Sequence, residues 1–180
     1  MPRVLNIEPT PNPDALKFLV SQKLLGAGVR SYKDFASAVG DPLGSALFAL
    51  GSITSVFYMD RFVTVNKEPG ATWTDLIDPV CEVLEDFDPP EVSGAAPAFA
   101  EGLPKDAKLE RILEVLDQRV RPGLAGDGGG LDVVAFEDHV LTISYHGACG
   151  SCPSASGGTL HFIETLLRDE VDPGLQVVIV

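Results

Sequence analysis

The pattern of hydrophobic and polar residues divides the chain into two structured parts. In the first part, short runs of β-branched and aromatic residues predict strands, and apolar residues at helical spacing predict helices. The predicted strands are residues 3–8, 16–20, 53–58 and 62–66, and the predicted helices are residues 31–39, 43–50 and 72–87. A short polar turn separates the last two strands, which favours a hairpin. We therefore expect a compact α+β domain over residues 1–88.

The second part has a different order of elements. An amphipathic helix is predicted over residues 106–120, and Pro122 and Gly123 are expected to end it. The glycine-rich residues 125–130 are interpreted as a flexible loop. The elements predicted after this loop are strands at 131–136 and 140–145, a helix at 159–169 and a strand at 175–180. The order is α-β-β-α-β, and we expect a second domain over residues 105–180.

Residues 89–104 lie between the two parts and follow neither pattern. Proline, glycine and alanine dominate this stretch, and its few apolar residues have no regular spacing. Such a composition is typical of a linker. The predicted fold class is therefore α+β, with two small α+β domains joined by a Pro/Gly/Ala linker.

Composition and charge exclude several kinds of partner. The formal net charge is −13, and acidic residues outnumber basic ones in both halves of the chain. Neither half offers the basic surface that nucleic acids require, so we expect no nucleic-acid partner. No apolar run approaches the roughly 20 residues of a membrane span, so we expect no membrane association. The first residues resemble neither a secretory signal nor a transit peptide, and we expect a cytoplasmic protein.

The chain has three cysteines. An odd, low number does not fit a disulfide-stapled secreted fold and favours reduced thiols. Cys81 falls on a helical pattern, where a small buried hydrophobic residue is expected. Cys149 and Cys152 form a Cys-x-x-Cys motif between a predicted strand and a predicted helix. This spacing lets two thiolates converge on one metal centre, so these two residues are the candidate site.

Three chemical interpretations of the motif compete. Common iron–sulfur clusters take four cysteines, so two chains would have to contribute Cys149 and Cys152 twice over. A cluster held between subunits should be exposed and labile. A redox dithiol is the second interpretation, but too few residues follow the motif to complete a thioredoxin fold. The third is structural zinc, with His146, Cys149, Cys152 and His161 as a ligand set within one chain.

No other motif in the sequence indicates chemistry. Residues 127–130 are rich in glycine, but they lack the lysine and the glycine spacing of phosphate-binding loops. No Ser-His-Asp set or pair of carboxylates stands out. We therefore do not expect an enzyme with its own turnover.

Several stretches resemble known domains. Arg121–Gly129, Gly147–Ser154 and the pair Thr159-Leu160 resemble the NifU C-terminal domain. Thr10–Phe18 and Asp60–Val65 resemble the Nfu N-terminal domain. The likeness covers nearly the whole chain, in the family's domain order.

The resemblance implies an Nfu-type iron–sulfur scaffold or carrier. Such proteins accept a labile [4Fe–4S] cluster, hold it between two subunits through the Cys-x-x-Cys cysteines, and pass it to apo-proteins. On this chain the ligands would be Cys149 and Cys152. The implied partners are a second copy of the chain when loaded, upstream scaffold or donor proteins that supply the cluster, and apo iron–sulfur client proteins.

The chain departs from the family pattern in two places. The family usually has an acid after Asp127-Gly128-Gly129, whereas this chain has Gly130 and then delays its acid to Asp132. Between Cys152 and Thr159 the chain has one residue more than usual. We expect this extra residue to loosen the start of the following helix. Neither departure removes a ligand.

Overall fold

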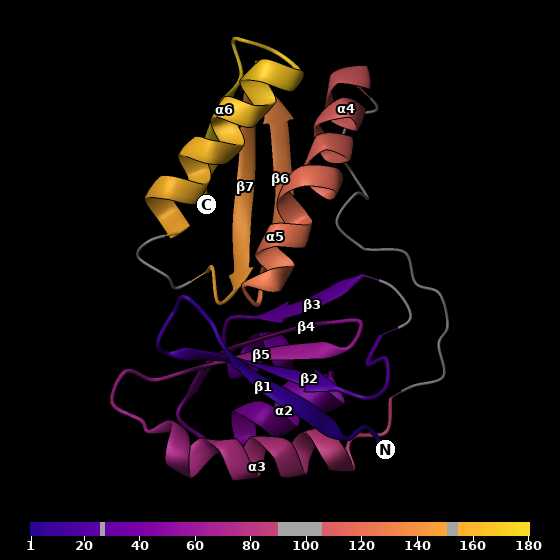
Figure 1. The fold of residues 1–180 in the computed structure, drawn as a ribbon, viewed down its shortest axis with the longest axis vertical. Helices are drawn as coiled ribbons and strands as arrows, with labels where there is room; N and C mark the ends of the chain where they lie inside the picture. Colours follow the sequence, from indigo (N-terminus) through magenta and orange to yellow (C-terminus); the bar gives the residue numbers. More distant parts are fainter. Residues whose placement is uncertain (26–27, 90–105, 151–154) are drawn as a thin grey trace. The chain divides into compact units, whose positions relative to one another are not determined.

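The computed structural model describes residues 1–25, 28–89, 106–150 and 155–180. The chain divides into two compact units, Met1–Pro97 and Ala98–Val180. Each unit has its own sheet, its own helices and its own hydrophobic core (Figure 1). The predicted linker, residues 89–104, lies almost wholly outside the described residues. The proposed boundaries of 1–88, 89–104 and 105–180 therefore stay a prediction.

The first unit is built on a five-stranded antiparallel sheet with the order β1-β2-β5-β4-β3. Its strands are β1 (Val4–Pro9), β2 (Ala15–Val20), β3 (Val29–Tyr32), β4 (Ile53–Met59) and β5 (Phe62–Lys67). Its helices are α1 (Phe35–Ala38), α2 (Pro42–Ala49) and α3 (Trp73–Asp86). Helices α2 and α3 cover one face of the sheet (Figure 1). The predicted hairpin is confirmed as β4 and β5.

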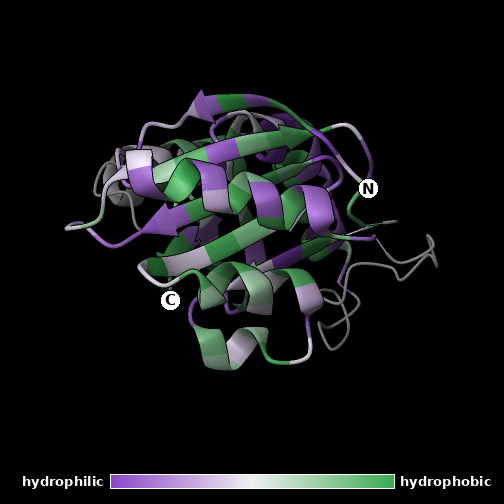
Figure 2. Ribbon diagram, turned by 90° about the horizontal axis from the view of Figure 1, so that it is seen from below, coloured by the Kyte–Doolittle hydropathy of each residue, from purple (hydrophilic) through white to green (hydrophobic). Residues whose placement is uncertain are grey.

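Helix α3 shows how the sequence pattern fixes the packing of this unit. Its buried residues Leu76, Val80 and Leu84 recur every four positions and form one apolar stripe. Figure 2 views the unit from the side of α3 and shows hydrophobic and hydrophilic residues alternating around its helices. Val80 and Leu84 of this stripe pack into the same core as the inward residues of β2, β4 and β5.

The predicted helix over residues 31–39 is largely wrong. Val29–Tyr32 is a strand paired with β4, and only the single turn Phe35–Ala38 is helical. Pairing with β4 satisfies the backbone groups of this segment, and the Tyr32 ring packs against Tyr58 with their centroids 6.5 Å apart. Phe35 and Val39, which a helix over residues 31–39 would place on one side with Tyr32, are exposed.

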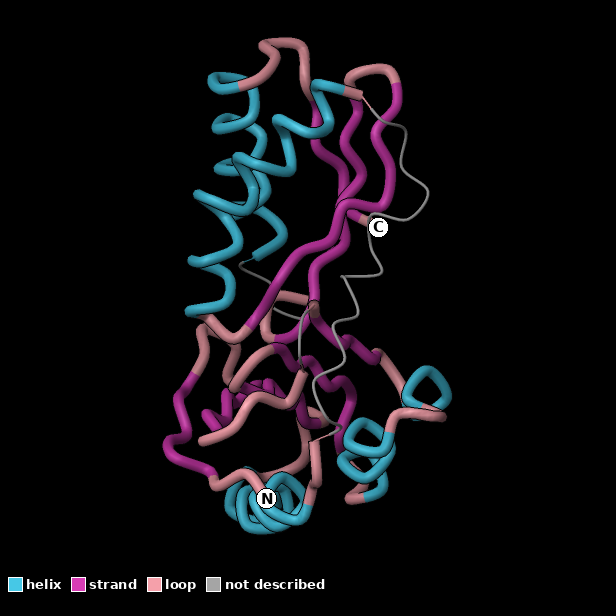
Figure 3. The backbone as a smooth tube through the Cα atoms, turned by 90° about the vertical axis from the view of Figure 1, so that its right-hand side faces the viewer, coloured by secondary structure: helices cyan, strands magenta, loops and turns pink. Residues whose placement is uncertain are grey.

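The second unit confirms the predicted order α-β-β-α-β. Its sheet has the order β6-β7-β8, with β6 and β7 antiparallel and β7 and β8 parallel. The strands are β6 (Gly129–Glu137), β7 (Val140–Gly147) and β8 (Gln176–Ile179). The helical segments are α4 (Ala107–Val115), η1 (Leu116–Val120), α5 (Arg121–Gly126), η2 (Ala155–Thr159) and α6 (Leu160–Glu170), where η marks a π-helical turn. The helices of this unit pack on one face of its sheet (Figure 3).

Pro122 and Gly123 do not end the first helix of this unit, contrary to the prediction. The helix continues to Gly126 through the π-helical turn η1, in which the Arg121 N–H donates to the Leu116 carbonyl. This shift in hydrogen-bond register places Pro122 in the first turn of α5, where a missing N–H is tolerated. The predicted flexible loop is correspondingly shorter, because Gly129 already belongs to β6.

A second π-helical turn, η2, precedes α6. A π-helical turn contains one more residue per hydrogen-bonded ring than an α-helical turn. The turn therefore accommodates one additional residue ahead of α6 without breaking the helical path, at the place where the sequence carries its extra residue.

Among the described residues, no helix is long and apolar enough to cross a bilayer.

Asp172 ties three parts of the second unit together. Its carboxylate accepts hydrogen bonds from Lys108 Nζ at 2.6 Å and from the Gly174 N–H at 2.9 Å, and it lies 2.7 Å from His139 Nδ1. The Lys108 hydrogen bond, followed by the Gly174 N–H, holds the pKa of Asp172 well below its ordinary value. The carboxylate thus joins the start of α4 to the β6–β7 turn and to the turn before β8.

We expect Asp172→Asn to lower the melting temperature of the second unit at pH 7. A folded-state pKa below the unfolded value contributes stability above the unfolded pKa, about 4, and this contribution is lost as pH falls through the folded pKa. The difference from wild type should therefore shrink between about pH 4 and pH 2. Calorimetry across this range measures it, with Asp169→Asn on α6 as a charge-matched control. A difference that stays constant down to pH 2 would contradict the assignment.

Candidate functional site

The cysteine loop leaves the sheet at the end of β7. His146 and Gly147 are the last residues of the strand, and Ala148, Cys149 and Gly150 are the described start of the loop. Cys149 is a half-buried cysteine that packs against the core of the second unit. Cys152, the other predicted site residue, lies outside the described residues. The structure therefore gives the surroundings of one cysteine of the motif.

Gly129, the first residue of β6, and Gly128 before it form a glycine floor beneath Cys149. Gly129 pairs with Gly147, and the Ala148 N–H donates to the Gly128 carbonyl at 3.1 Å. A Cβ atom added at Gly129 would overlap Cys149 Sγ and would lie 2.9 Å from the His146 carbonyl oxygen. Only glycine fits at position 129 without moving the cysteine. The sequence interpretation noted the glycines of Asp127-Gly128-Gly129 but missed this role, because spacing does not show which side chain packs against them.

The strand register places Cys149 and His146 on opposite faces of the sheet. Residues directly opposite each other in an antiparallel pair share a face, and successive residues alternate. Leu131 faces Tyr145, and both belong to the core on the helix side. His146 pairs with Gly130 and therefore faces the other side. Cys149 lies where the Cβ of Gly129 would be, which is on the helix side.

His146 is engaged with an acid on its own face of the sheet. Its Nε2 atom lies 2.6 Å from Asp132 Oδ2, and both side chains are about 11% exposed. His161, the other histidine of the proposed zinc set, is exposed on α6. Across the described ranges, no three His, Cys, Asp or Glu side chains are grouped as a metal site. The structure thus does not bring His146, Cys149 and His161 together.

Tyr145 is the titratable neighbour of Cys149. Its side chain is 6% exposed, and its hydroxyl has no hydrogen-bond partner in the described structure. Burial, and secondarily the negative charge of the Cys149 thiolate, raise the pKa of Tyr145 to about 12. The tyrosine therefore keeps its proton at neutral pH and can donate a hydrogen bond. The sequence interpretation treated Tyr145 only as a strand residue.

Comparisons with known proteins match both units. Residues 5–89 match the family model described as "Scaffold protein Nfu/NifU N terminal", and residues 112–178 match the one described as "NifU-like domain". These matches support the class of Nfu-type iron–sulfur scaffold proteins. The chain belongs to the Nfu family within this class and carries both of its domains, as the resemblance predicted.

The curated relatives agree with this assignment. The NFU1 iron-sulfur cluster scaffold homolog, mitochondrial, of Drosophila ananassae is 32% identical over 91% of this chain and 59% of the relative. The NifU-like protein 5, mitochondrial, of Arabidopsis thaliana is 31% identical over 93% of this chain and 64% of the relative. The chain thus spans about 60% of the length of the first relatives it matches.

Solved structures are similar to about half of the chain. A crystal structure of protein SAV1430 from Staphylococcus aureus is 22% identical and covers 46% of this chain and 98% of its own, with a TM-score of 0.41. A solution structure of a NifU-like protein from Saccharomyces cerevisiae is 25% identical and covers 46% of this chain and 76% of its own, with a TM-score of 0.39.

The predicted cytoplasmic location is wrong. The Drosophila and Arabidopsis relatives are named as mitochondrial proteins. The prediction rested on the first residues, which resemble neither a secretory signal nor a transit peptide, and on the low, odd number of cysteines. Reduced thiols are expected in any reducing compartment, so they do not distinguish the cytoplasm from another such compartment.

We expect Gly129→Ala to displace Cys149, because the added methyl group would occupy the position of Cys149 Sγ. Overpacking of this kind costs about 1 to 3 kcal/mol, and here part of it should appear as movement of the loop. In a Cys81→Ala background, the loop thiols should react faster with a disulfide reagent. Gly123→Ala in α5 is the matched control, because a Cβ there meets nothing within 4 Å. Equal rates for wild type, control and variant would show that Gly129 does not hold the loop.

Proposed function

We propose that two copies of this chain hold a [4Fe–4S] cluster between them through Cys149 and Cys152 of each copy, and pass it to apo-proteins. The supporting observation is an incomplete ligand set. Cys149 lies at the end of the sheet, and the described part of its unit offers no further ligands grouped into a metal site. A cluster with four cysteine ligands would then need the Cys-x-x-Cys motif twice.

The surroundings of Cys149 suit a cargo that must be both held and released. The glycine floor fixes the backbone on either side of the thiol, which limits the number of positions that the sulfur can take. The side chain is only half-buried, so an apo-protein thiol can reach the cluster and replace a ligand. A deeply buried cluster would be retained, as electron-transfer centres are.

The scaffold role implies partners upstream and downstream. Iron–sulfur donor proteins supply the cluster, and apo iron–sulfur proteins receive it. We expect the chain itself to catalyse no turnover, because its part in the exchange is to bind and release. Its net charge of −13 argues against a nucleic-acid partner.

Anaerobic reconstitution with iron and sulfide tests the proposal. We expect wild type to bind four irons per two chains, and the mass in solution to double on loading. The double variant Cys149→Ala/Cys152→Ala should bind no cluster and stay at the apo mass. Cys81→Ala is the matched control and should load as wild type does, because Cys81 lies on α3 of the first unit.

Two results would contradict the proposal. The first is a loaded species of apo mass in which one chain holds its metal alone. The second is normal iron binding by the double variant, which would place the ligands elsewhere. Measuring zinc in the same samples separates the carrier from a zinc-stabilised module.

A further inference from the structure

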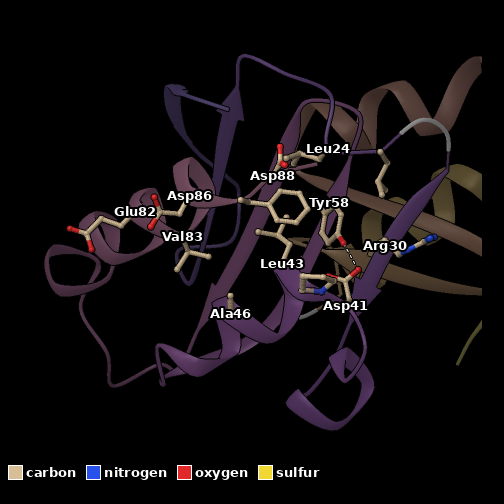
Figure 4. Close-up of a pocket in the computed structure, with 13 residues that line it drawn as sticks. Leu24, Arg30, Asp41, Leu43, Ala46, Tyr58, Glu82, Val83, Asp86 and Asp88 are labelled. Atoms are coloured by element: carbon tan, nitrogen blue, oxygen red, sulfur yellow. Dashed lines mark hydrogen bonds between the residues drawn. The ribbon is translucent and has the colours of Figure 1, made fainter. Parts of the chain in front are cut away.

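The first unit contains a groove that the cluster chemistry does not use. It has a volume of about 780 Å³ and is lined by residues of β3, β4, α2, α3 and the segments next to them (Figure 4). Leu25, Val83 and Phe87 are half-buried and give the groove an apolar lining, to which the exposed Ala46 adds its methyl group. All of these residues belong to the first unit.

The floor of the groove is held by a hydrogen-bond network. The Tyr58 hydroxyl donates to Asp41 Oδ2 at 2.5 Å, and the Gly44 N–H donates to Asp41 Oδ1 at 2.7 Å. Burial, followed by the hydrogen bond to Asp41, raises the pKa of Tyr58 far above its ordinary value, so this donor is permanent. The groove is therefore formed before any ligand arrives, which lowers the entropy cost of binding.

The rim of the groove is acidic along one side. Glu82 and Asp86 are exposed residues four positions apart on α3, so they share a face of the helix, and exposed Asp88 follows them. Arg30 is the one cation among the described lining residues (Figure 4). The row of carboxylates extends further than one small cation can contact. It complements a chain segment that carries several positive charges.

We propose that this groove docks a short segment of a partner protein in which apolar side chains alternate with Lys or Arg. The apolar side chains fill the space between α2 and α3, and the basic groups face Glu82, Asp86 and Asp88. Such docking goes beyond cluster binding, because it places partner recognition on the unit that lacks the Cys-x-x-Cys motif. Charge complementarity raises the rate of encounter, and apolar burial supplies most of the affinity.

Fluorescence anisotropy of the full-length apo chain tests this proposal with three labelled synthetic peptides of equal length. One alternates Leu with Lys and Arg, one alternates Leu with Glu, and one alternates Ser with Lys and Arg. We expect saturable binding of the first alone, with the Ser peptide at least about tenfold weaker, since one lost apolar contact of about 1.4 kcal/mol has that effect. Absence of saturable binding by the Leu/Lys/Arg peptide overturns the proposal.

Two pairs of variants locate the binding. Glu82→Lys/Asp86→Lys should weaken binding of the Leu/Lys/Arg peptide at least about tenfold more than Asp78→Lys/Glu110→Lys does. The second pair changes the net charge equally, at residues that do not line the groove. Ala46→Trp should block binding by filling the groove, whereas Ala49→Trp on the same helix should not. Binding that is equal in both charge variants, or unchanged in Ala46→Trp, overturns the proposal.

The outcomes also separate docking from cluster binding. Ala46→Trp should load iron as wild type does, because Ala46 and the cysteine loop belong to different units. If Ala46→Trp instead changes the sedimentation of the apo chain and leaves peptide binding intact, the groove receives a second copy of the chain and the proposal fails. Failure of wild type to load iron would contradict the proposed function but would not affect the docking proposal.

A different observation supports a second inference, which depends on the proposed function. Buried hydroxyl groups in folded proteins normally have hydrogen-bond partners, so an unpartnered one calls for an explanation. The Tyr145 hydroxyl is such a group, and Cys149 packs against the same core cluster to which Tyr145 belongs. We infer that Tyr145 is a positioning residue, whose hydroxyl donates to the Cys149 sulfur once that sulfur is a cluster ligand.

Tyr145→Phe should therefore have opposite effects on the stability of the apo chain and on the retention of the cluster by the loaded dimer. The apo chain should melt at the same or a higher temperature, because the variant removes an unsatisfied buried group. The loaded dimer should lose its cluster about tenfold faster, since a hydrogen bond to a charged group is lost. The Fe–S stretching bands in resonance Raman spectra should shift on exchange into D₂O in wild type, and this shift should diminish in the variant.

Tyr32→Phe in the first unit is the control and should leave cluster loss and the Raman shift unchanged. If Tyr145→Phe loads the cluster normally and its release rate and Raman shift are unchanged, this inference is overturned and the proposed function is not affected. Failure of wild type to load any cluster would overturn the proposed function and this inference with it. A destabilised apo Tyr145→Phe chain would show instead that the hydroxyl has a structural partner.

Discussion

The site depends on how closely two backbone segments approach at the start of the second sheet. Cys149 Sγ occupies the space where any residue other than Gly129 would place its Cβ. The adjacent hydrogen bond from the Ala148 N–H to the Gly128 carbonyl holds the two segments at this distance. The position of Cys149 is therefore a consequence of the strand pairing between β6 and β7.

The same pairing separates two kinds of chemistry. The helix side of the sheet carries Cys149 and Tyr145, next to an apolar core that keeps the thiol partly desolvated. The opposite side carries His146 and Asp132, whose Nε2 and Oδ2 atoms lie 2.6 Å apart. A histidine three residues before a cysteine is an attractive zinc ligand in sequence. Strand alternation decides against it here, because the imidazole and the thiol leave the backbone in opposite directions.

Periodicity was a reliable guide wherever one face of an element is buried. It predicted the β4–β5 hairpin, the apolar stripe of α3 and the α-β-β-α-β order of the second unit. It failed where tertiary pairing or hydrogen-bond register outweighs local preference. Val29–Tyr32 became a strand because β4 offers it partners, and Pro122 is tolerated because η1 shifts the register before it. The role of Gly129 was not predictable from spacing, because it depends on a side chain twenty residues further along.

A carrier faces a conflict between affinity and release. If recognition of the recipient relied on the cluster itself, tighter recognition would mean slower delivery. In the proposed arrangement the energy of docking comes from a preformed apolar groove with an acidic rim, on a unit with its own core. The energy of holding the cargo comes from thiolates on another unit. The docking energy and the cluster-binding energy share no residue, so each can change without the other. A recipient can then be bound firmly while the carrier holds the cluster loosely.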